Sequence, residues 1–487
     1  MTPLLIISCI AIYFSILLFI SWYTSKNATQ QSYFIGNRKS AWYLVAFGLI
    51  GDSLSGVTFV SVPGAVYNQQ FGYMQLVLGY LLGYLVIAKV LLPLYYKLQL
   101  TSIYSYLGTR FGHNSQKTGS FFFILSRLIG AAFRLYISAT VLQLFIFDAW
   151  GVPFWLTVSV VIALILLYTY RGGIKTLVWT DTLQSGFLLL GVILSIVAIA
   201  NALNLDFMGI VRTVNESPYS QIFFWDWQAK SNFFKQFFSG AFIAIVMTGL
   251  DQNMMQKNLS CKSLGEAQKN IYWFSFVLIF VNLFFVSLGA LLYAYATKMG
   301  IELPTKTDQL FPLLALNHLG IFAAIVFVLG ITAATFSSAD SVLTTLTTSF
   351  CIDFLGQNPD VESTKSRNTR HLVHITFAFL LLMVIIIFQK INNDAVINSV
   401  FTAAGYTYGP LLGLFGLGLF TNIKVKDRWV PIICIISPIL VWIVDKNSAE
   451  WMGGYKFGFE LLMLNGLITF IGLMMIRASR MKQNVAS

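Results

Sequence analysis

The chain has 487 residues, of which 57% are hydrophobic and only 10% are charged. A soluble domain carries about 25% charged residues, so this composition excludes a water-soluble enzyme. The formal net charge of +12 does not indicate a nucleic-acid-binding protein, because the Lys and Arg residues are spread over short loops. A membrane protein with many spans remains, since apolar runs of about 20 residues recur along the whole chain.

The apolar runs predict an all-α membrane protein with about thirteen transmembrane helices. Helices of this kind need about 20 apolar residues to cross the hydrocarbon layer. The predicted spans are residues 4–22, 41–66, 71–95, 118–147, 153–170, 177–203, 233–256, 271–299, 320–352, 371–389, 395–420, 429–445 and 457–476. Because thirteen is odd, the two termini are expected on opposite sides of the membrane.

Lys and Arg residues are distributed unequally between alternate loops. One set of loops contains twenty of them and the other set contains eight. The richer set is expected on the cytoplasmic side. This predicts a protein of the plasma membrane, in bacteria the inner membrane, with its N-terminus outside and its C-terminus in the cytoplasm. The first apolar run lacks the basic start and cleavage site of a signal peptide, so it is expected to remain as a span.

Two predicted spans contain residues that disfavour a continuous helix. The second includes residues 48–56 (GLIGDSLSG), and the seventh includes residues 248–253 (TGLDQN). Backbone groups released at such a break need partners inside the protein, so the breaks are expected to line an enclosed cavity. Their separation by five spans predicts an inverted repeat with a binding site where the broken helices meet. Alternatively, the small residues form a tightly packed helix interface.

This organisation divides the chain into five parts. They are the first span with a cytoplasmic loop (1–40), the first repeat (41–203), an extracellular loop (204–232), the second repeat (233–420), and two C-terminal helices with a cytoplasmic tail (421–487).

The ninth predicted span carries hydroxyl groups and a carboxylate on one helical face. At about 100° per residue, one arc of the helix holds Ala334, Ser337, Ser338 and Ser341, with Asp340 at its edge. Oxygen ligands suit a small hard cation, and carbonyls freed near Gly51 and Leu54 would complete its coordination. Alternatively, each hydroxyl bonds to a carbonyl one turn earlier in its own helix.

Five motifs, in this order and on these spans, resemble those of a known family. They are 51–56 (GDSLSG) leading to 63–67 (PGAVY), 170–175 (YRGGIK) leading to 179–184 (WTDTLQ), 248–252 (TGLDQ), 266–269 (EAQK) and 337–341 (SSADS). Over nearly its whole length the chain resembles the sodium:solute symporter family, and its pattern is closest to sodium/sialic acid, sodium/galactose and sodium/proline symporters. The resemblance implies a LeuT-type fold, a 5+5 inverted repeat with two broken helices.

The resemblance also implies where sodium binds. The family's core sodium site matches the carbonyls of Gly51, Leu54 and Ala334 with the hydroxyls of Ser337 and Ser338. A second sodium site, present in some members, matches Asp181, Ser337, Asp340 and Ser341. Asp340 departs from the hydroxyl residue expected in the sialic acid carriers; it either adds a ligand or adds an anionic charge that makes the site sensitive to protons. Sodium, as one or two ions, is the only metal or cofactor expected.

The solute contacts implied by the resemblance lie on the second, third and seventh spans. The run 54–59 (LSGVTF) resembles the sialic acid carriers more than the galactose carriers and implies contacts from Ser55 and Thr58, with Tyr80 beside them. Met247 stands where the galactose carriers place a Tyr gate, which disfavours a neutral hexose. An amino or carboxylic acid remains open, because the proline carriers share the same small polar break.

Two arginines lie inside the fourth predicted span. Arg127 and Arg134 are seven residues apart and therefore share a helical face. They could bind a solute carboxylate in the bidentate manner that Arg favours, and Arg127, Arg134 and Asp251 are included in the predicted solute site. They could equally pair with Asp52 and Asp251 and hold the helices together.

These inferences predict a sodium-coupled symporter that imports a small polar organic solute by alternating access. The solute is expected to be a sialic acid or related sugar, or an organic or amino acid. The expected partners are this solute and the lipid bilayer, with no nucleic acid, and the protein is expected to act as a monomer. Two alternatives are a receptor that binds solute without moving it and a membrane-embedded enzyme that uses buried Asp residues with His371 or His374.

Overall fold

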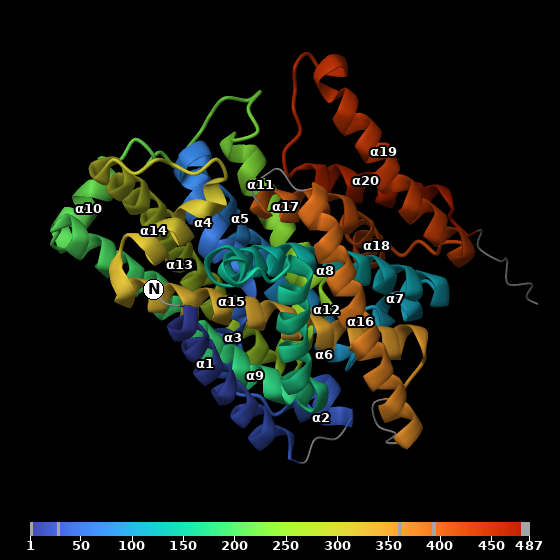
Figure 1. Ribbon diagram of the computed structural model, residues 1–487. Helices are drawn as coiled ribbons and strands as arrows, with labels where there is room; N and C mark the ends of the chain where they lie inside the picture. Colours follow the sequence, from blue (N-terminus) through green and yellow to red (C-terminus); the bar gives the residue numbers. More distant parts are fainter. Residues whose placement is uncertain (1–2, 27–29, 359–362, 392–395, 479–487) are drawn as a thin grey trace, which may run out of the picture.

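The computed structural model describes residues 3–26, 30–358, 363–391 and 396–478, and these residues form helices joined by short connections (Figure 1). Within these ranges, β-type pairing is limited to two isolated bridges, Ser40 with Cys261 and Val425 with Arg477. An all-α chain suits a bilayer, because a helix satisfies its backbone hydrogen bonds within one segment. The predicted all-α fold class is confirmed.

The helices follow the predicted apolar runs. In the first half of the chain they are α1 (Pro3–Ser25), α2 (Gln30–Ile35), α3 (Trp42–Ser53), α4 (Gly56–Gln69), α5 (Tyr73–Val86), α6 (Leu92–Lys97), α7 (Ser105–Arg110), α8 (His113–Leu142), α9 (Phe154–Leu203) and α10 (Phe207–Asn215). In the second half they are α11 (Phe233–Ala244), α12 (Gln252–Leu259), α13 (Leu264–Met299), α14 (Leu310–Asn317), α15 (Gly320–Ser349), α16 (Thr364–Ile391), α17 (Val396–Thr407), α18 (Gly409–Phe420), α19 (Val430–Trp451) and α20 (Leu461–Met475).

Each of the thirteen predicted ranges contains helix. Among the described residues, eight helical segments are long and apolar enough to cross a membrane, and nine are when the bent pair Phe233–Gly249 and Gln252–Leu259 counts as one span. The other predicted ranges hold shorter or interrupted helices, such as Gly409–Phe420 and Leu461–Met475. The polytopic architecture is therefore confirmed, whereas the count of thirteen crossings stays a prediction.

Large apolar side chains point outward from the helices. Phe19, Leu167 and Leu372 are 63%, 65% and 67% exposed. In water such exposure would be costly, but a bilayer offers these side chains an apolar solvent. The outer surface is therefore built to face lipid.

The centre of the molecule is formed around α15. Every residue from Gly330 to Ser349 is buried, and α15 packs against α3, α4, α8 and α9. Figure 1 shows α3, α9 and α15 in the middle of the bundle, with α19 and α20 at the edge opposite α1. The polar face of α15 predicted from the sequence is thus enclosed by other helices.

A kink at Gly173 separates the fifth and sixth predicted spans. The structure runs them together as α9, but Gly173 adopts φ 54° and ψ −153°, which is not helical. A side chain at this position would overlap the Cα atom of Tyr33. Glycine tolerates both the positive φ and the close approach, so the helix changes direction here.

Candidate functional site

The two breaks predicted from the sequence are present. Helix α3 ends at Ser53, Leu54 forms its C-cap, and α4 starts at Gly56 after Ser55. In the seventh predicted span, a turn of π-helix ends at Gly249, and the axis bends by 62° before α12 begins. Such breaks free backbone groups for ligands.

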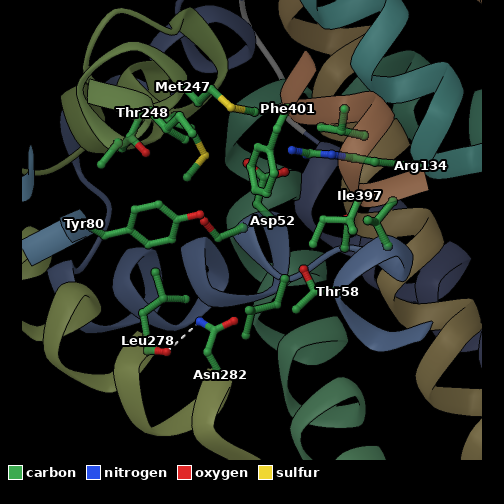
Figure 2. A pocket seen from close by; sticks show the side chains of 18 of the residues that line it. Asp52, Thr58, Tyr80, Arg134, Met247, Thr248, Leu278, Asn282, Ile397 and Phe401 are labelled. Carbon is green, nitrogen blue, oxygen red and sulfur yellow. Dashed lines mark hydrogen bonds between the residues drawn. The ribbon is translucent and has the colours of Figure 1, made fainter. Parts of the chain in front are cut away.

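A central cavity lies between the two breaks. The empty space among its lining atoms is about 690 Å³, a figure that includes space open to solvent. Six residues of the predicted solute site line it: Ser55, Thr58, Tyr80, Arg127, Arg134 and Met247. The sequence interpretation missed other lining residues, among them Tyr73, Tyr84, Thr248, Asn282 and Phe401. Figure 2 shows Tyr80, Thr248, Phe401 and Arg134 around this space.

The two arginines of α8 have different surroundings. Arg127 Nε lies 2.5 Å from Asp251 Oδ2, and its guanidinium also donates to the carbonyl of Met247 at 3.2 Å. Tyr408 donates a second hydrogen bond to Asp251 Oδ2 at 2.6 Å. Asp251 is fully buried and also accepts a bond from the Met254 N–H, which caps α12. The Arg127–Asp251 pair therefore joins α8 to the break in the second broken helix.

Asp251, one of the predicted solute residues, does not line the central cavity. Its oxygens are used by Arg127, Tyr408 and the start of α12. Arg134, by contrast, makes no ion pair with any described residue, and its nitrogen atoms point into the central cavity in Figure 2. Of the alternatives open in the sequence, the pairing with Asp251 holds for Arg127, and Arg134 is left available to a ligand.

The predicted core sodium residues lie on two helices in contact, α3 and α15. Gly51, Leu54, Ala334, Ser337 and Ser338 are all buried. The hydroxyl of Ser338 has no hydrogen-bond partner in the part of the chain that the structure describes. A buried hydroxyl without a partner costs free energy unless a ligand binds it. These oxygens therefore have the chemistry that a small hard cation needs.

The four predicted residues of the second sodium site also come together. Ser337, Asp340 and Ser341 on α15 lie beside Asp181 on α9, and Ser337 donates to Asp181 Oδ1 at 3.3 Å. Asp340 accepts a hydrogen bond from the hydroxyl of Tyr168 at 2.7 Å. All four side chains are fully buried.

Lys257 lies among these oxygens, which the sequence interpretation did not anticipate. The predicted seventh span, 233–256, ends just before Lys257, which places this lysine among the twenty cytoplasmic-loop residues. In the structure, α12 continues through Leu259 and the Lys257 side chain is only 2% exposed. Removing Lys257 from the loop count leaves nineteen against eight, so the predicted orientation does not change. One sequence feature bears on this position. If the predicted helix is extended by one turn past residue 256, Asn253 and Lys257 stand four residues apart and therefore share one helical face.

The alternative of a membrane-embedded enzyme named His371 and His374. Within the described residues no group of three potential metal ligands occurs. His374 is buried, and its two ring nitrogens lie 3.0 Å and 2.9 Å from the hydroxyls of Thr169 and Thr347. The imidazole thus connects α9, α15 and α16, and its nitrogens are already occupied.

The chain is similar in sequence to known sodium-coupled transporters. The sodium/sialic acid symporter NanT of Aliivibrio fischeri is 25% identical over 463 residues, which is 92% of this chain and 89% of that protein. Sodium-coupled monocarboxylate transporter 1 of Xenopus laevis is 27% identical over 422 residues, 80% of this chain and 63% of that protein.

The fold has a solved counterpart. The structure of a substrate-bound, outward-open Na+-coupled sialic acid symporter has a TM-score of 0.81 at 22% identity and covers 96% of this chain and 97% of that one. The LeuT-type fold is thereby confirmed. The model of the sodium:solute symporter family matches residues 33–426. The chain therefore belongs to the sodium:solute symporter family and is an integral membrane, sodium-coupled solute transporter rather than an enzyme.

Proposed function

We propose that the chain imports a small organic acid together with sodium, and that the carboxylate of this solute binds Arg134. The observation that carries the proposal is the guanidinium of Arg134, which faces the central cavity without an ionic partner among the described residues. Arg127, two helical turns away, is neutralised by Asp251. An uncompensated guanidinium in a confined cavity is a strong site for a carboxylate, which it can bind with two parallel hydrogen bonds.

The rest of the central cavity suits a solute with polar groups. Hydroxyls of Ser55, Thr58 and Tyr80 and the amide of Asn282 line it, beside apolar walls from Met247 and Phe401. A few polar groups on an apolar wall are typical of small-molecule sites. The names of the two relatives refer to a sialic acid and to monocarboxylates, and both are carboxylates at neutral pH. These two classes are therefore the first candidates.

An amino acid is the second candidate, and Asp52 favours it. Asp52 lines the central cavity, and its Oδ1 has no hydrogen-bond partner in the described part of the chain. An ammonium group on the solute could bind this oxygen while its carboxylate binds Arg134. A neutral sugar offers no charge to either residue.

Sodium is proposed to bind at the core site formed by Gly51, Leu54, Ala334, Ser337 and Ser338. This site adjoins the break at Leu54, whose neighbours Ser55 and Asp52 line the central cavity. Sodium bound here would fix the broken end of α3 and thereby the shape of the cavity. Such a link between ion and solute is what couples their transport.

Uptake into proteoliposomes tests the proposal. Radiolabelled N-acetylneuraminic acid, lactate, proline and galactose are offered under an inward sodium gradient and, as the control, under an equal potassium gradient. Sodium-dependent uptake of at least one acid and no uptake of galactose is the expected result. Uptake of galactose alone would contradict the role of Arg134, and equal uptake in potassium would contradict sodium coupling.

The predicted orientation is part of the proposal. An N-terminus outside and a C-terminus in the cytoplasm agree with the bias in loop charges. Reporter fusions at the C-terminus, one active only in the cytoplasm and one only outside, would test this orientation.

A further inference from the structure

A lysine occupies the centre of a buried cluster of oxygens. Lys257 Nζ lies 2.6 Å from Asp181 Oδ2 and 3.2 Å from Asp52 Oδ2, and it donates to Ser341 Oγ at 2.8 Å. We call Lys257, Asp181, Asp52 and Ser341 the lysine cluster. Two carboxylate oxygens and one hydroxyl oxygen lie around the ammonium group. The side chain is therefore held by two ion pairs and one hydrogen bond.

The partners of this ammonium include residues predicted to bind a second sodium ion. Asp181 and Ser341 belong to both sets, and Ser337, another member of the predicted site, donates to the other oxygen of Asp181. A sodium ion and an ammonium group carry the same charge and prefer the same hard oxygen ligands. Asp181 Oδ2 and Ser341 Oγ cannot coordinate a sodium ion while the ammonium group fills the space between them.

The lysine also joins the two broken helices. It extends from α12, beyond the second break, to Asp52 on α3, just before the first break. Asn253, one turn earlier on α12, donates to the same Asp52 oxygen at 2.7 Å. Asp181 on α9 and Ser341 on α15 complete the contact. One ammonium group thus links four helices, and two of them, α3 and α15, carry residues of the proposed core sodium site.

We propose that the ammonium group of Lys257 takes the place of a second sodium ion, so that each transport cycle uses a single sodium ion at the core site. Part of this inference rests on the proposed function, because the remaining ion is assigned to the proposed core site. A cation attached to the chain stays with the protein and does not move down the sodium gradient. It holds the site together as an ion would but adds no driving force.

The carboxyl groups near Lys257 outnumber the ammonium group. Asp52, Asp181 and Asp340 are three buried carboxylates, and Lys257 is the ammonium group that pairs with two of them. Asp340 has no ion pair within the described residues and is hydrogen-bonded by Tyr168. The unpartnered hydroxyl of Ser338 lies on the same helix as Asp340 and is a ligand of the proposed core site.

Counting bound sodium ions tests the inference without knowledge of the solute. Equilibrium binding of 22Na+ is measured on the purified full-length chain in detergent, with potassium as the competing control ion. The wild-type protein is expected to bind one sodium ion per chain. Lys257→Ala vacates the position between Asp181 and Ser341 and is expected to bind two. Lys257→Arg keeps a positive charge there and is expected to bind one.

A matched double variant tests the position of the added ion. Lys257→Ala combined with Asp181→Asn removes the ammonium group together with its nearest carboxylate, so it is expected to return to one ion. Two ions in the wild-type protein, or one ion in Lys257→Ala, would overturn the inference. No ion in the wild-type protein would instead overturn the proposed core site, and the gain of one ion in Lys257→Ala would still support the role of Lys257.

Lys257→Gln serves if the alanine variant does not fold, because it keeps N–H donors but carries no charge. Its thermal stability is measured in sodium and in potassium. Sodium is expected to raise its melting temperature by more than it raises that of the wild-type protein, since the variant has an additional sodium site. An equal rise in both proteins would overturn the inference.

Discussion

The lysine cluster and the central cavity both contain buried charges beside the first helix break, but they differ in how these charges are compensated. In the lysine cluster, the ammonium group forms ion pairs with two carboxylates and donates to one hydroxyl, and these partners come from three other helices. In the central cavity, Arg134 has no ionic partner among the described residues. Charges that a protein compensates internally hold its helices together, whereas an uncompensated charge in a cavity is available to a ligand.

The same difference separates the two arginines of α8. Arg127 is bound by Asp251 and by the Met247 carbonyl, so its charge is compensated within the protein, like that of Lys257. Arg134 lies two turns along the same helix and lines the central cavity. Variants of these positions therefore separate effects on stability from effects on solute binding.

The largest effect is expected for Arg127→Met. Removing the guanidinium leaves the carboxylate of Asp251 buried without its ionic partner, which costs about 3 to 5 kcal/mol. Thermal unfolding of the purified protein should show a large loss of stability. Adding Asp251→Asn removes the stranded charge and should recover much of that loss. An Arg127→Met variant as stable as the wild-type protein would show that this pair does not hold the second break.

Arg134→Ala is expected to act on solute affinity instead. A hydrogen bond to a charged group contributes about 1.5 to 3 kcal/mol, so affinity for the acidic solute should fall about tenfold to over a hundredfold. Stability should change little, because no ionic partner is left behind. Arg134→Lys keeps the charge but not the bidentate geometry, so its affinity for the acidic solute should lie between those of the wild-type protein and Arg134→Ala. The measurement is a solute titration by thermal shift or by uptake.

If Arg134→Ala keeps full affinity for the acid found in the uptake screen, the comparison between the two arginines fails. The carboxylate of the solute would then need another partner. Sodium binding in the absence of solute serves as the control, since it should be nearly unchanged in Arg134→Ala.

Smaller effects are expected for the two serines of the proposed core site, and the two variants should differ in stability. Ser338 Oγ has no partner in the described structure, so Ser338→Ala should weaken sodium binding severalfold, by about 1 kcal/mol, and leave stability intact in potassium. Ser337 donates to Asp181, so Ser337→Ala should weaken sodium binding and also lower stability in potassium. A 22Na+ titration with parallel melting curves distinguishes them. Unchanged sodium affinity in both variants would remove this site.

The helix breaks could be predicted from the sequence because they depend on local residues. Small polar residues and glycines around Ser53 and Asp251 disfavour a continuous helix within lipid, and the breaks are at those positions. The polar face of α15 could be predicted for the same reason, since helical periodicity is local. Residues that line the central cavity on α4 and α5 followed from the family resemblance.

The pairing of charges could not be predicted, because it joins residues far apart in the chain. The sequence gives no reason why Asp251 should bind Arg127 rather than Arg134, which lies on the same face of α8. Lys257 falls in a predicted loop because the predicted seventh span, 233–256, ends just before it. Its carboxylate partners on α3 and α9 become visible only when the helices are packed. Asn282 was missed because no helix break and no charged residue lies near it on α13.

The smallest expected effect concerns Asn282 and distinguishes the solute classes. Its amide nitrogen donates to the Leu278 carbonyl at 2.7 Å, while its amide oxygen has no partner in the described chain and the residue lines the central cavity. A hydroxyl group of a sialic acid could donate to this oxygen, whereas lactate bound at Arg134 has fewer groups to reach it. A neutral hydrogen bond contributes about 0.5 to 1.5 kcal/mol, so Asn282→Leu should weaken a polyhydroxylated acid about two- to tenfold and change lactate affinity little. Competition of unlabelled acids against labelled solute measures both affinities in the same variant. Equal losses for the two acids would mean that Asn282 shapes the cavity through α13 packing and does not contact the solute.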